Sequence, residues 1–339
     1  MYSLTSNIDK VRRHWTTVPG LPSLGRLRKQ VLGIDAAEAS FGRRRFHWKD
    51  DQTRTRLEKI GSTFLLGYNA ALEENDLPVL AKQLNSCDRE LRGFAFEGAA
   101  MGLTLLDSLT PWNNERLLQF ISGPGARHVY MVHVGSGWAI ARLPWLRLNL
   151  KQHLRRLHPL FSWLALDGYG FHEGYFNWPR YVVEQQLPNR LSAYGLRAFD
   201  QGLGRSLWFI EGGDVDRIPI TIGRFPYHRR ADLWSGIGLA CAYAGGVSAG
   251  SIEAIQQAAA VFSPHLAQGA AFAAKARQLA GNETQHTDLA CRFFTGLPAT
   301  RAAAITDEAL RDLPASGKEP PYEVWRERIR IMLAAKSAS

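Results

Sequence analysis

Cysteine is scarce in this chain of 339 residues, and it does not occur in a metal-binding spacing. The three cysteines, Cys87, Cys241 and Cys291, are odd in number, lie far apart and form no Cys-x-x-Cys pair. This pattern argues against both a zinc finger and a disulfide framework. It fits a reducing compartment, where stable disulfides are rare, and we therefore expect a cytoplasmic protein.

Segments for export or membrane insertion are also missing from the sequence. The N-terminus lacks the apolar stretch of a signal peptide. Residues 233–252 run without a charge, but they contain five glycines and three serines, and Gly245-Gly246 interrupts them. A transmembrane helix needs about 20 predominantly apolar residues. We therefore predict a buried helix followed by a turn here, and we do not expect an integral membrane protein.

Lysine is rare relative to arginine, with nine residues against 32, in a chain of formal net charge +10. Residues 1–60 hold 13 basic residues against six acidic ones. Arginine pairs well with carboxylate and phosphate groups. We predict a basic N-terminal arm over residues 1–50, which either binds an anionic partner or is simply solvated. No known nucleic-acid-binding module accompanies it, so we do not expect a nucleic-acid partner.

Apolar residues recur at helical spacing through most of the chain, and the strand–helix alternation of a parallel sheet is missing. A clear example is the helix predicted over about residues 56–74, whose apolar positions are Ile60, Phe64, Leu65, Tyr68 and Leu72. After residue 231 every segment favours a helix. The sequence therefore predicts a mainly α fold with few short strands.

Three segments depart from this helical pattern. Residues 128–143 are ambiguous, because the first half is rich in β-branched residues and could form a strand, while the second half favours a helix. Residues 168–178 are aromatic and glycine-rich, and we predict a loop that leads into a helix. Residues 214–228 place isoleucine at every second position, which predicts a strand or extended segment.

We divide the chain into the basic arm, a core over residues 51–250 and C-terminal helices over residues 251–339. The C-terminal helices are expected to pack on the core as one domain. Small residues allow helices to approach closely, so the glycine-rich segments of the core are expected to mark helix contacts.

Two short signatures recur within the core in the same order. One is an aromatic residue, a carboxylate with or without an amide, and a glycine; the other is Ser-Gly followed by small or aliphatic residues. They occur at residues 96–98, 136–141, 199–202 and 235–240. This order predicts two related helical units, residues 88–145 and 192–245, packed about a pseudo-twofold axis. Chance similarity between glycine- and alanine-rich helices is the alternative.

Known metal, nucleophile and nucleotide motifs are missing. His128 and His133, like His153 and His158, are five residues apart, which would place their rings about 140° apart on a helix. No complete G-x-S-x-G or phosphate-binding glycine motif occurs. We expect no metal and no bound cofactor. Histidines that are distant in sequence leave a metal- or cofactor-dependent oxidoreductase open as an alternative.

What stands out is a set of polar residues inside aromatic and glycine-rich segments. Such residues either form structural ion pairs between helices or line an aromatic pocket, and we predict the pocket. As ligand-binding residues we select Glu97, His133, Trp138, Arg142, Tyr169, Asp200, Gln201, Arg205, Arg230, Asp232 and Trp234. As catalytic residues we select Asp167, His172 and Glu173, because a carboxylate beside an imidazole in an apolar site can have pKa values suited to proton transfer.

Seven sequence blocks carry a resemblance to a known family. They are AEASFGRRRF (37–46), STFLLGYNAAL (62–72), FEGAAMGLTLLD (96–107), HVGSGWAIARL (133–143), DGYGFHEGYF (167–176), FDQGLGRSLWFIEG (199–212) and RRADLWSGIGLACAYAGG (229–246). Together, over about residues 25–250, they resemble the UnbL-type enediyne biosynthesis proteins. The resemblance implies an association with an iterative polyketide synthase and a thioesterase, but no particular reaction.

On this basis we expect an accessory protein of bacterial enediyne or other polyketide biosynthesis. It would bind or process a hydrophobic polyene or related polyketide intermediate in the aromatic pocket. One alternative is a non-enzymatic scaffold that recruits the synthase, another protein of the same cassette or a peptide precursor through its basic arm. The other alternative is the oxidoreductase named above.

Overall fold

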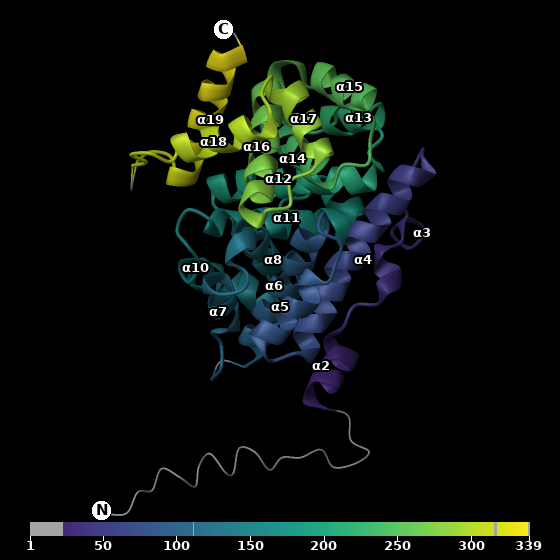
Figure 1. Cartoon of the computed structure of the whole chain (residues 1–339), viewed down its shortest axis with the longest axis vertical. Coiled ribbons are helices and arrows are strands. Elements are labelled where there is room, and N and C mark those ends of the chain that lie inside the picture. Colours follow the sequence, from purple (N-terminus) through teal and green to yellow (C-terminus); the bar gives the residue numbers. More distant parts are fainter. Residues whose placement is uncertain (1–22, 111, 315–316, 338–339) are drawn as a thin grey trace, which may run out of the picture.

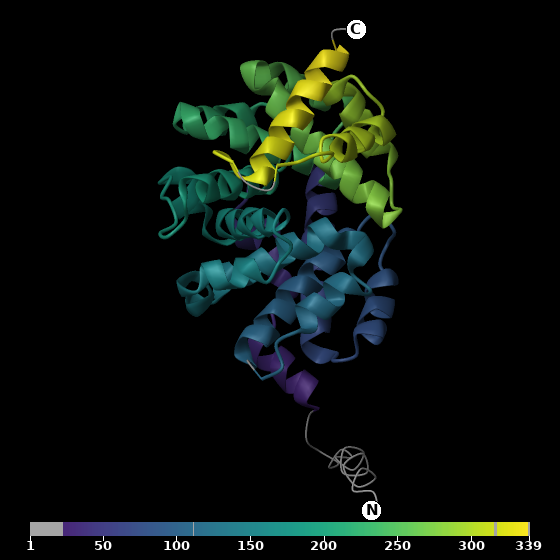
Figure 2. The ribbon, with the colours of Figure 1, turned by 90° about the vertical axis from the view of Figure 1, so that its left-hand side faces the viewer.

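The structure is a computed structural model that describes residues 23–110, 112–314 and 317–337. The described residues form helices and no strand, which confirms the prediction of a mainly α fold. The long core helices are α4 (Asp51–Glu73), α6 (Arg92–Leu109), α8 (Val129–Arg142), α11 (Ser162–Trp178), α12 (Ala193–Ile210), α14 (Tyr227–Ala244) and α16 (Ser263–Ala280). Their order along the chain is also their order in space, since each helix packs on the next one to form a stack (Figures 1 and 2).

Shorter helices flank this stack and connect its members. Near the N-terminus lie α2 (Leu24–Leu32), the 3₁₀ turn η1 (Ala36–Ala39) and α3 (Phe41–Arg44). The connecting elements are α5 (Leu77–Asn85), α7 (Arg116–Ser122), η2 (Ala126–His128), α9 (Pro144–Leu148), α10 (Leu150–Arg155), the π-helical turn η3 (Pro179–Val183), α13 (Arg217–Gly223), α15 (Ala249–Ala259) and η4 (Ala260–Phe262). The C-terminal helices are α17 (Gln285–Thr295), α18 (Ala299–Glu308) and α19 (Pro321–Ser337).

Pairs of glycines allow the stacked helices to approach one another closely. A methyl group added at Gly135 of α8 would lie 2.0 Å from the carbonyl oxygen of Glu97 in the preceding helix. One added at Gly137 would lie 1.8 Å from that of Ala165 in the following helix. Helices α11, α12 and α14 repeat this arrangement with their own Gly-x-Gly pairs. The glycines that face the preceding helix in α8, α11, α12, α14 and α16 are Gly135, Gly168, Gly202, Gly236 and Gly269, at intervals of 33 or 34 residues.

The signatures that suggested a duplication belong to this shorter repeat. Gly98 and Gly202 occupy the same position, because each faces the preceding helix of the stack. Gly137 and Gly236 do not, because Gly137 faces the following helix and Gly236 the preceding one. The two signatures are therefore out of register by two residues, and each stacked helix forms one repeat that contacts mainly its neighbours.

The three segments expected to depart from the helical pattern are helical, so the strand and loop expected in them are absent, whereas the helix predicted in the second half of residues 128–143 is confirmed. Residues 129–142 form α8, because burial against α6 and α11 outweighs the weak strand preference of its valines. Residues 168–178 lie in α11, where the glycines are helix contacts and do not signal a loop. In residues 214–228, Ile218 and Ile222 are buried one helical turn apart in α13, whereas Ile220 is 59% exposed.

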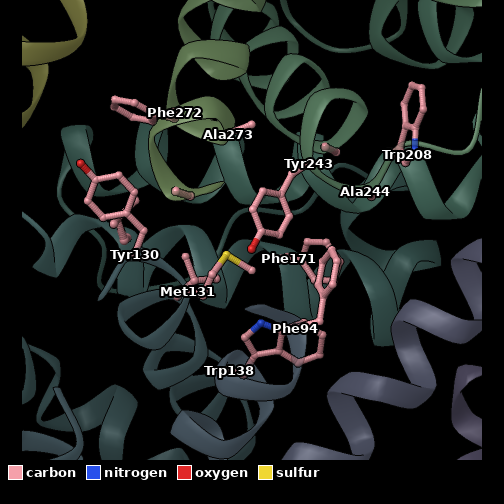
Figure 3. Close-up of a cluster of buried hydrophobic side chains, with 14 of the residues drawn as sticks. Phe94, Tyr130, Met131, Trp138, Phe171, Trp208, Tyr243, Ala244, Phe272 and Ala273 are labelled. Atoms are coloured by element: carbon pink, nitrogen blue, oxygen red, sulfur yellow. The ribbon is translucent and has the colours of Figure 1, made fainter. Parts of the chain in front are cut away.

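The stack is curved, and aromatic side chains close its inner side. Figure 3 shows Phe94 of α6 and Tyr243 of α14 pointing toward one another, and their ring centroids are 5.1 Å apart. Tyr130 of α8 and Phe272 of α16 approach similarly, at 6.5 Å. Early and late members of the stack therefore contact one another around a shared core.

Two further predictions can be compared with the structure. The uncharged segment 233–252 is a buried helix that ends at Ala244, followed by a turn at Gly245 and Gly246, which have φ of 69° and 101°, as predicted. Within the described ranges no helix has the length and apolarity needed to cross a bilayer. Of the predicted basic arm, residues 1–22 lie outside the described residues, and the remainder forms α2, η1 and α3 against α4.

Candidate functional site

A row of polar side chains follows from the glycine repeat. In five helices, a polar residue stands immediately before the glycine that faces the previous helix of the stack. These residues are Glu97 in α6, Asp167 in α11, Gln201 in α12, Ser235 in α14 and Gln268 in α16. All five are buried. Because the stacked helices share one register, these side chains lie along one line through the interior.

Hydrogen bonds join most members of this row, which we call the polar row. The Nε2 group of Gln201 donates to Oδ2 of Asp167 at 2.8 Å. The hydroxyl Oγ of Ser235 lies 3.3 Å from Oε1 of Gln201 and 3.0 Å from Oε1 of Gln268. α8 interrupts the row with Val134, so Glu97 and Asp167 need another partner to connect them. That partner comes from α12.

Arg205 of α12 bridges the two carboxyl groups. One guanidinium nitrogen is paired with Oδ1 of Asp167, and the other lies 3.6 Å from Oε1 of Glu97. Trp138 of α8 donates its indole N–H to the same oxygen of Glu97 at 3.1 Å. Arg205 and both carboxyl groups are almost fully buried, so two acids share one internal cation.

This shortage of positive charge affects the proton affinity of Glu97. Burial raises the pKa of Glu97 to about 7, because the charged form loses its hydration. The guanidinium of Arg205 opposes this increase, and the carboxylate of Asp167 adds to it. Both protonation states of Glu97 are therefore accessible near neutral pH, which suits a general acid or base.

A small cavity lies beside Glu97. Its volume is about 30 Å³, and its walls come from η1, α4, α6, α8, α11 and α12. The lining includes Phe64, Trp138, Phe171, Tyr175 and Phe209, together with Glu97 and Arg205 as polar groups. The rings of Phe64 and Trp138 are tilted at a centroid distance of 4.1 Å. We call this space the aromatic cavity.

At the other end of the polar row, α19 supplies a buried ion cluster. Arg326, which is fully buried, donates from Nε to Gln268 at 3.0 Å and pairs with Asp232 at 2.8 Å and Glu323 at 3.1 Å. Arg197 lies 3.0 Å from both carboxylates, and Arg330 lies 2.7 Å from Glu323. This cluster fastens α19 to the stack.

The family of the chain follows from its sequence over the folded region. Residues 23–333, which include every helix of the stack, match the family described as "Protein of unknown function (DUF1702)". The chain belongs to this family. No curated protein and no solved structure matches the chain. Membership in the DUF1702 family names no activity, so the function must be argued from the site.

The structure of this DUF1702 protein does not bring the three predicted catalytic residues together. Asp167 faces the polar row, whereas His172 lies five residues further along α11 and packs between the rings of Trp138 and Phe176. Burial, with nearby arginines, lowers the pKa of His172 to about 3. Glu173 is next to His172 in sequence, about 100° around the helix, and accepts a hydrogen bond from Asn177 at 2.7 Å.

The predicted ligand-binding residues fall into several separate groups. Glu97, Trp138 and Arg205 line the aromatic cavity, Gln201 lies in the polar row beside Asp167, and Asp232 belongs to the ion cluster of α19. Asp200 forms a buried pair with Arg229, and Arg230 donates to the carbonyl groups of Phe225 and Gly223. The remaining residues are His133, Arg142, Tyr169 and Trp234, of which Arg142 is exposed and the others are buried.

Histidine and cysteine do not assemble a metal centre in the described part of the chain, where no three potential metal ligands come together. His133 illustrates the reason. Its Nδ1 lies 2.7 Å from the carbonyl oxygen of Val129, and its ring packs against Phe161.

Sequence reasoning missed several members of the site. Ser235 and Gln268 belong to the polar row, Arg326 donates a hydrogen bond to Gln268, and Phe64 lines the aromatic cavity. A usable signal was present, because each polar-row residue stands directly before a glycine that recurs at a regular interval. Arg326 has no such signal, since only the packing of α19 brings it to the row.

Proposed function

We propose that this protein binds a hydrophobic conjugated polyene in the aromatic cavity and that Glu97 transfers a proton to or from it. The setting would be bacterial enediyne or other polyketide biosynthesis, as the resemblance to the UnbL-type proteins suggests. The single observation that carries the chemical part of the proposal is a buried carboxyl with a pKa of about 7 at the wall of an aromatic cavity.

The chemistry of the cavity fits such a ligand. Aromatic rings supply a planar apolar surface for a conjugated chain, while a site with few polar groups fixes its orientation. Protonated Glu97 can donate a proton at one carbon of the polyene, and its carboxylate can remove a proton from another carbon. This sequence moves double bonds, leaves the mass unchanged and requires no oxidant or reductant.

The neighbours of Glu97 have positioning roles in this proposal. Trp138 holds one carboxyl oxygen through its indole N–H, and Arg205 compensates the negative charge when the proton leaves. Asp167 holds Arg205 in place through their ion pair. Its negative charge also offsets the lowering of the Glu97 pKa by Arg205, so that this pKa stays near neutrality.

A ligand larger than one water molecule requires the cavity to widen. Its outer wall contains Glu38 and Ala39 of η1 and Gly61 of α4. Ala39 lies close to this glycine, because a methyl group at Gly61 would be 3.1 Å from the methyl group of Ala39. We propose that outward displacement of η1 admits the polyene.

The test is to mix the purified protein with the polyene released by an enediyne synthase and its thioesterase. Absorbance spectra and masses are recorded over time, and the polyene is then extracted and measured again. The proposal predicts a changed absorbance that persists after extraction, at unchanged mass, and its loss with Glu97→Gln. Glu253→Gln, which alters an exposed carboxyl on α15, serves as the matched control.

Other outcomes distinguish the alternatives. A shifted spectrum that reverts on extraction would make the protein a carrier and remove the role of Glu97 in proton transfer. No spectral change at all would reject polyene binding and favour the scaffold that recruits other proteins. A metal in the purified protein, found by elemental analysis, would favour the oxidoreductase.

A further inference from the structure

A second pocket lies between the C-terminal end of α6 and the short elements α7, α9 and α10. Its volume is about 260 Å³, and it shares no lining residue with the aromatic cavity. Figure 1 shows α7 and α10 on the same flank of the molecule. The lining residues used below are Asp107, Leu117, Trp145, Leu146, His153, Arg156 and Leu157. We call this space the flank pocket.

His153 lines the flank pocket and carries an unpartnered ring nitrogen. The residue is only 9% exposed, and its Nε2 has no hydrogen-bond partner among the described residues. Burial, with a smaller contribution from Arg156, lowers the pKa of His153 to about 4, so the imidazole is neutral near pH 7. Buried polar atoms in folded proteins usually have a partner, so a ligand that reaches this nitrogen would satisfy it.

The charge around the pocket favours an anion. Asp107 is already satisfied, because it accepts hydrogen bonds from the backbone N–H groups of Arg116 and Leu117 and from the guanidinium of Arg116. Arg156 donates to the carbonyl oxygen of Asn114, and no carboxylate lies within ion-pair distance of it in the described chain. Residues 116–166 contain no acidic residue at all. One uncompensated cation therefore lines the pocket.

The remaining walls favour a flat apolar body. Leu117, Leu146 and Leu157 supply aliphatic surface, and the indole of Trp145, which is 42% exposed, stands at the rim. An engineered protein cavity of about 150 Å³ holds benzene, so the flank pocket has room for one substituted ring or two fused rings.

We propose that the flank pocket binds a small planar organic carboxylate. The carboxylate pairs with Arg156, the ring lies against Trp145 and the leucines, and His153 hydrogen-bonds to a polar group of the ligand through Nε2. This site is independent of the function proposed for the aromatic cavity.

The test measures binding of 2-naphthoate, and of its neutral analogue naphthalene-2-carboxamide, by calorimetry and ligand-observed NMR. The proposal predicts that 2-naphthoate binds the full chain with a Kd below about 1 mM. Arg156→Met weakens 2-naphthoate about tenfold and leaves the carboxamide unchanged, because a charge-assisted contact is lost. Arg155→Met, which removes an exposed neighbouring charge outside the pocket, leaves both unchanged.

His153→Phe preserves the ring shape and removes the nitrogen, so both ligands should weaken about tenfold. If this variant does not fold, the binding of the two ligands to Arg156→Met tests the proposal by itself. Absence of binding, or equal weakening by Arg155→Met and Arg156→Met, would overturn the proposal. Loss of 2-naphthoate binding in Glu97→Gln would place the ligand in the aromatic cavity and would also overturn it.

Discussion

The indole N–H of Trp138 lies 3.1 Å from a carboxyl oxygen of Glu97, inside a stack of helices where neither group reaches solvent. The two residues come from adjacent helices, and the contact depends on Gly135, which lets α8 approach the backbone of α6 at Glu97 itself. The close glycine contact that allows the helices to stack therefore also brings residues of the candidate site together.

Glu97→Gln should change how stability depends on pH. The pKa of Glu97 is raised by burial to about 7 in the folded state, against 4.5 ordinarily, so the folded protein binds the extra proton. Its stabilising contribution is present below about pH 4.5 and is lost as pH rises toward 7. At pH 8 the variant should be more stable than the wild type by on the order of 2 kcal/mol, and at pH 5 about equal.

Urea unfolding at both pH values measures this difference, with Glu253→Gln as the control. Equal stability of wild type and Glu97→Gln at pH 8 would mean that the Glu97 carboxyl is not displaced from its ordinary pKa.

Arg205→Met should be strongly destabilising, because it leaves Glu97 and Asp167 without their shared cation. Removing one partner of a buried ion pair typically costs about 3–5 kcal/mol. The loss should be smaller at pH 5, where Glu97, whose pKa is raised by burial, is protonated. Chemical denaturation measures it, and Arg43→Met, which removes an arginine with 65% side-chain exposure, is the control. A loss below about 1 kcal/mol, as for surface pairs, would contradict a buried charge centre.

Gly137→Ala tests the close approach of the stacked helices. In an exposed helix this substitution stabilises by about 1 kcal/mol. Here the new methyl group would lie 1.8 Å from the carbonyl oxygen of Ala165, so we expect destabilisation of about 2 kcal/mol or more. Gly223→Ala in α13 meets no atom within 4 Å and should be neutral or stabilising. The urea midpoints of the two variants measure these effects. A Gly137→Ala midpoint equal to that of the wild type would contradict the close packing of α8 on α11.

Glu323→Gln should weaken the protein above acidic pH and flatten its acid unfolding. Burial acts to raise the pKa of Glu323, but Arg326, Arg330 and Arg197 outweigh it and lower the pKa to about 2. The carboxylate therefore stabilises the fold above about pH 4.5, and this contribution is lost as pH falls toward 2. Glu327→Gln, on an exposed position of α19, is the matched control. Identical acid-unfolding curves for the two variants would count against the ion cluster.

The positions of the helices could largely be predicted from the sequence, because apolar residues at helical spacing are a local signal. The helix predicted over about residues 56–74 illustrates this, since α4 spans Asp51–Glu73. The glycine-rich segment 168–178 was predicted wrongly for a physical reason. Glycine normally disfavours helices, but here it is retained because a neighbouring backbone occupies the space of a side chain.

The candidate site could be predicted only in part. Glu97, Trp138 and Arg205 were selected as polar or aromatic residues in apolar segments, and the structure places them together. His172 and Glu173 were selected for their adjacency in sequence, but adjacent helical residues point in different directions. Arg326 reaches Gln268 only through a contact between distant segments, which no local sequence pattern predicts.

The central claim is that Glu97 titrates near neutrality at the wall of a polyene-binding cavity. The most direct test is carbon-13 NMR of glutamate labelled at the side-chain carboxyl, in which the Glu97 resonance is identified by its absence in Glu97→Gln. The account predicts a midpoint near pH 7 and a shift of this resonance when the polyene is added. A midpoint near 4.5, or a resonance that does not respond to the polyene, would contradict it.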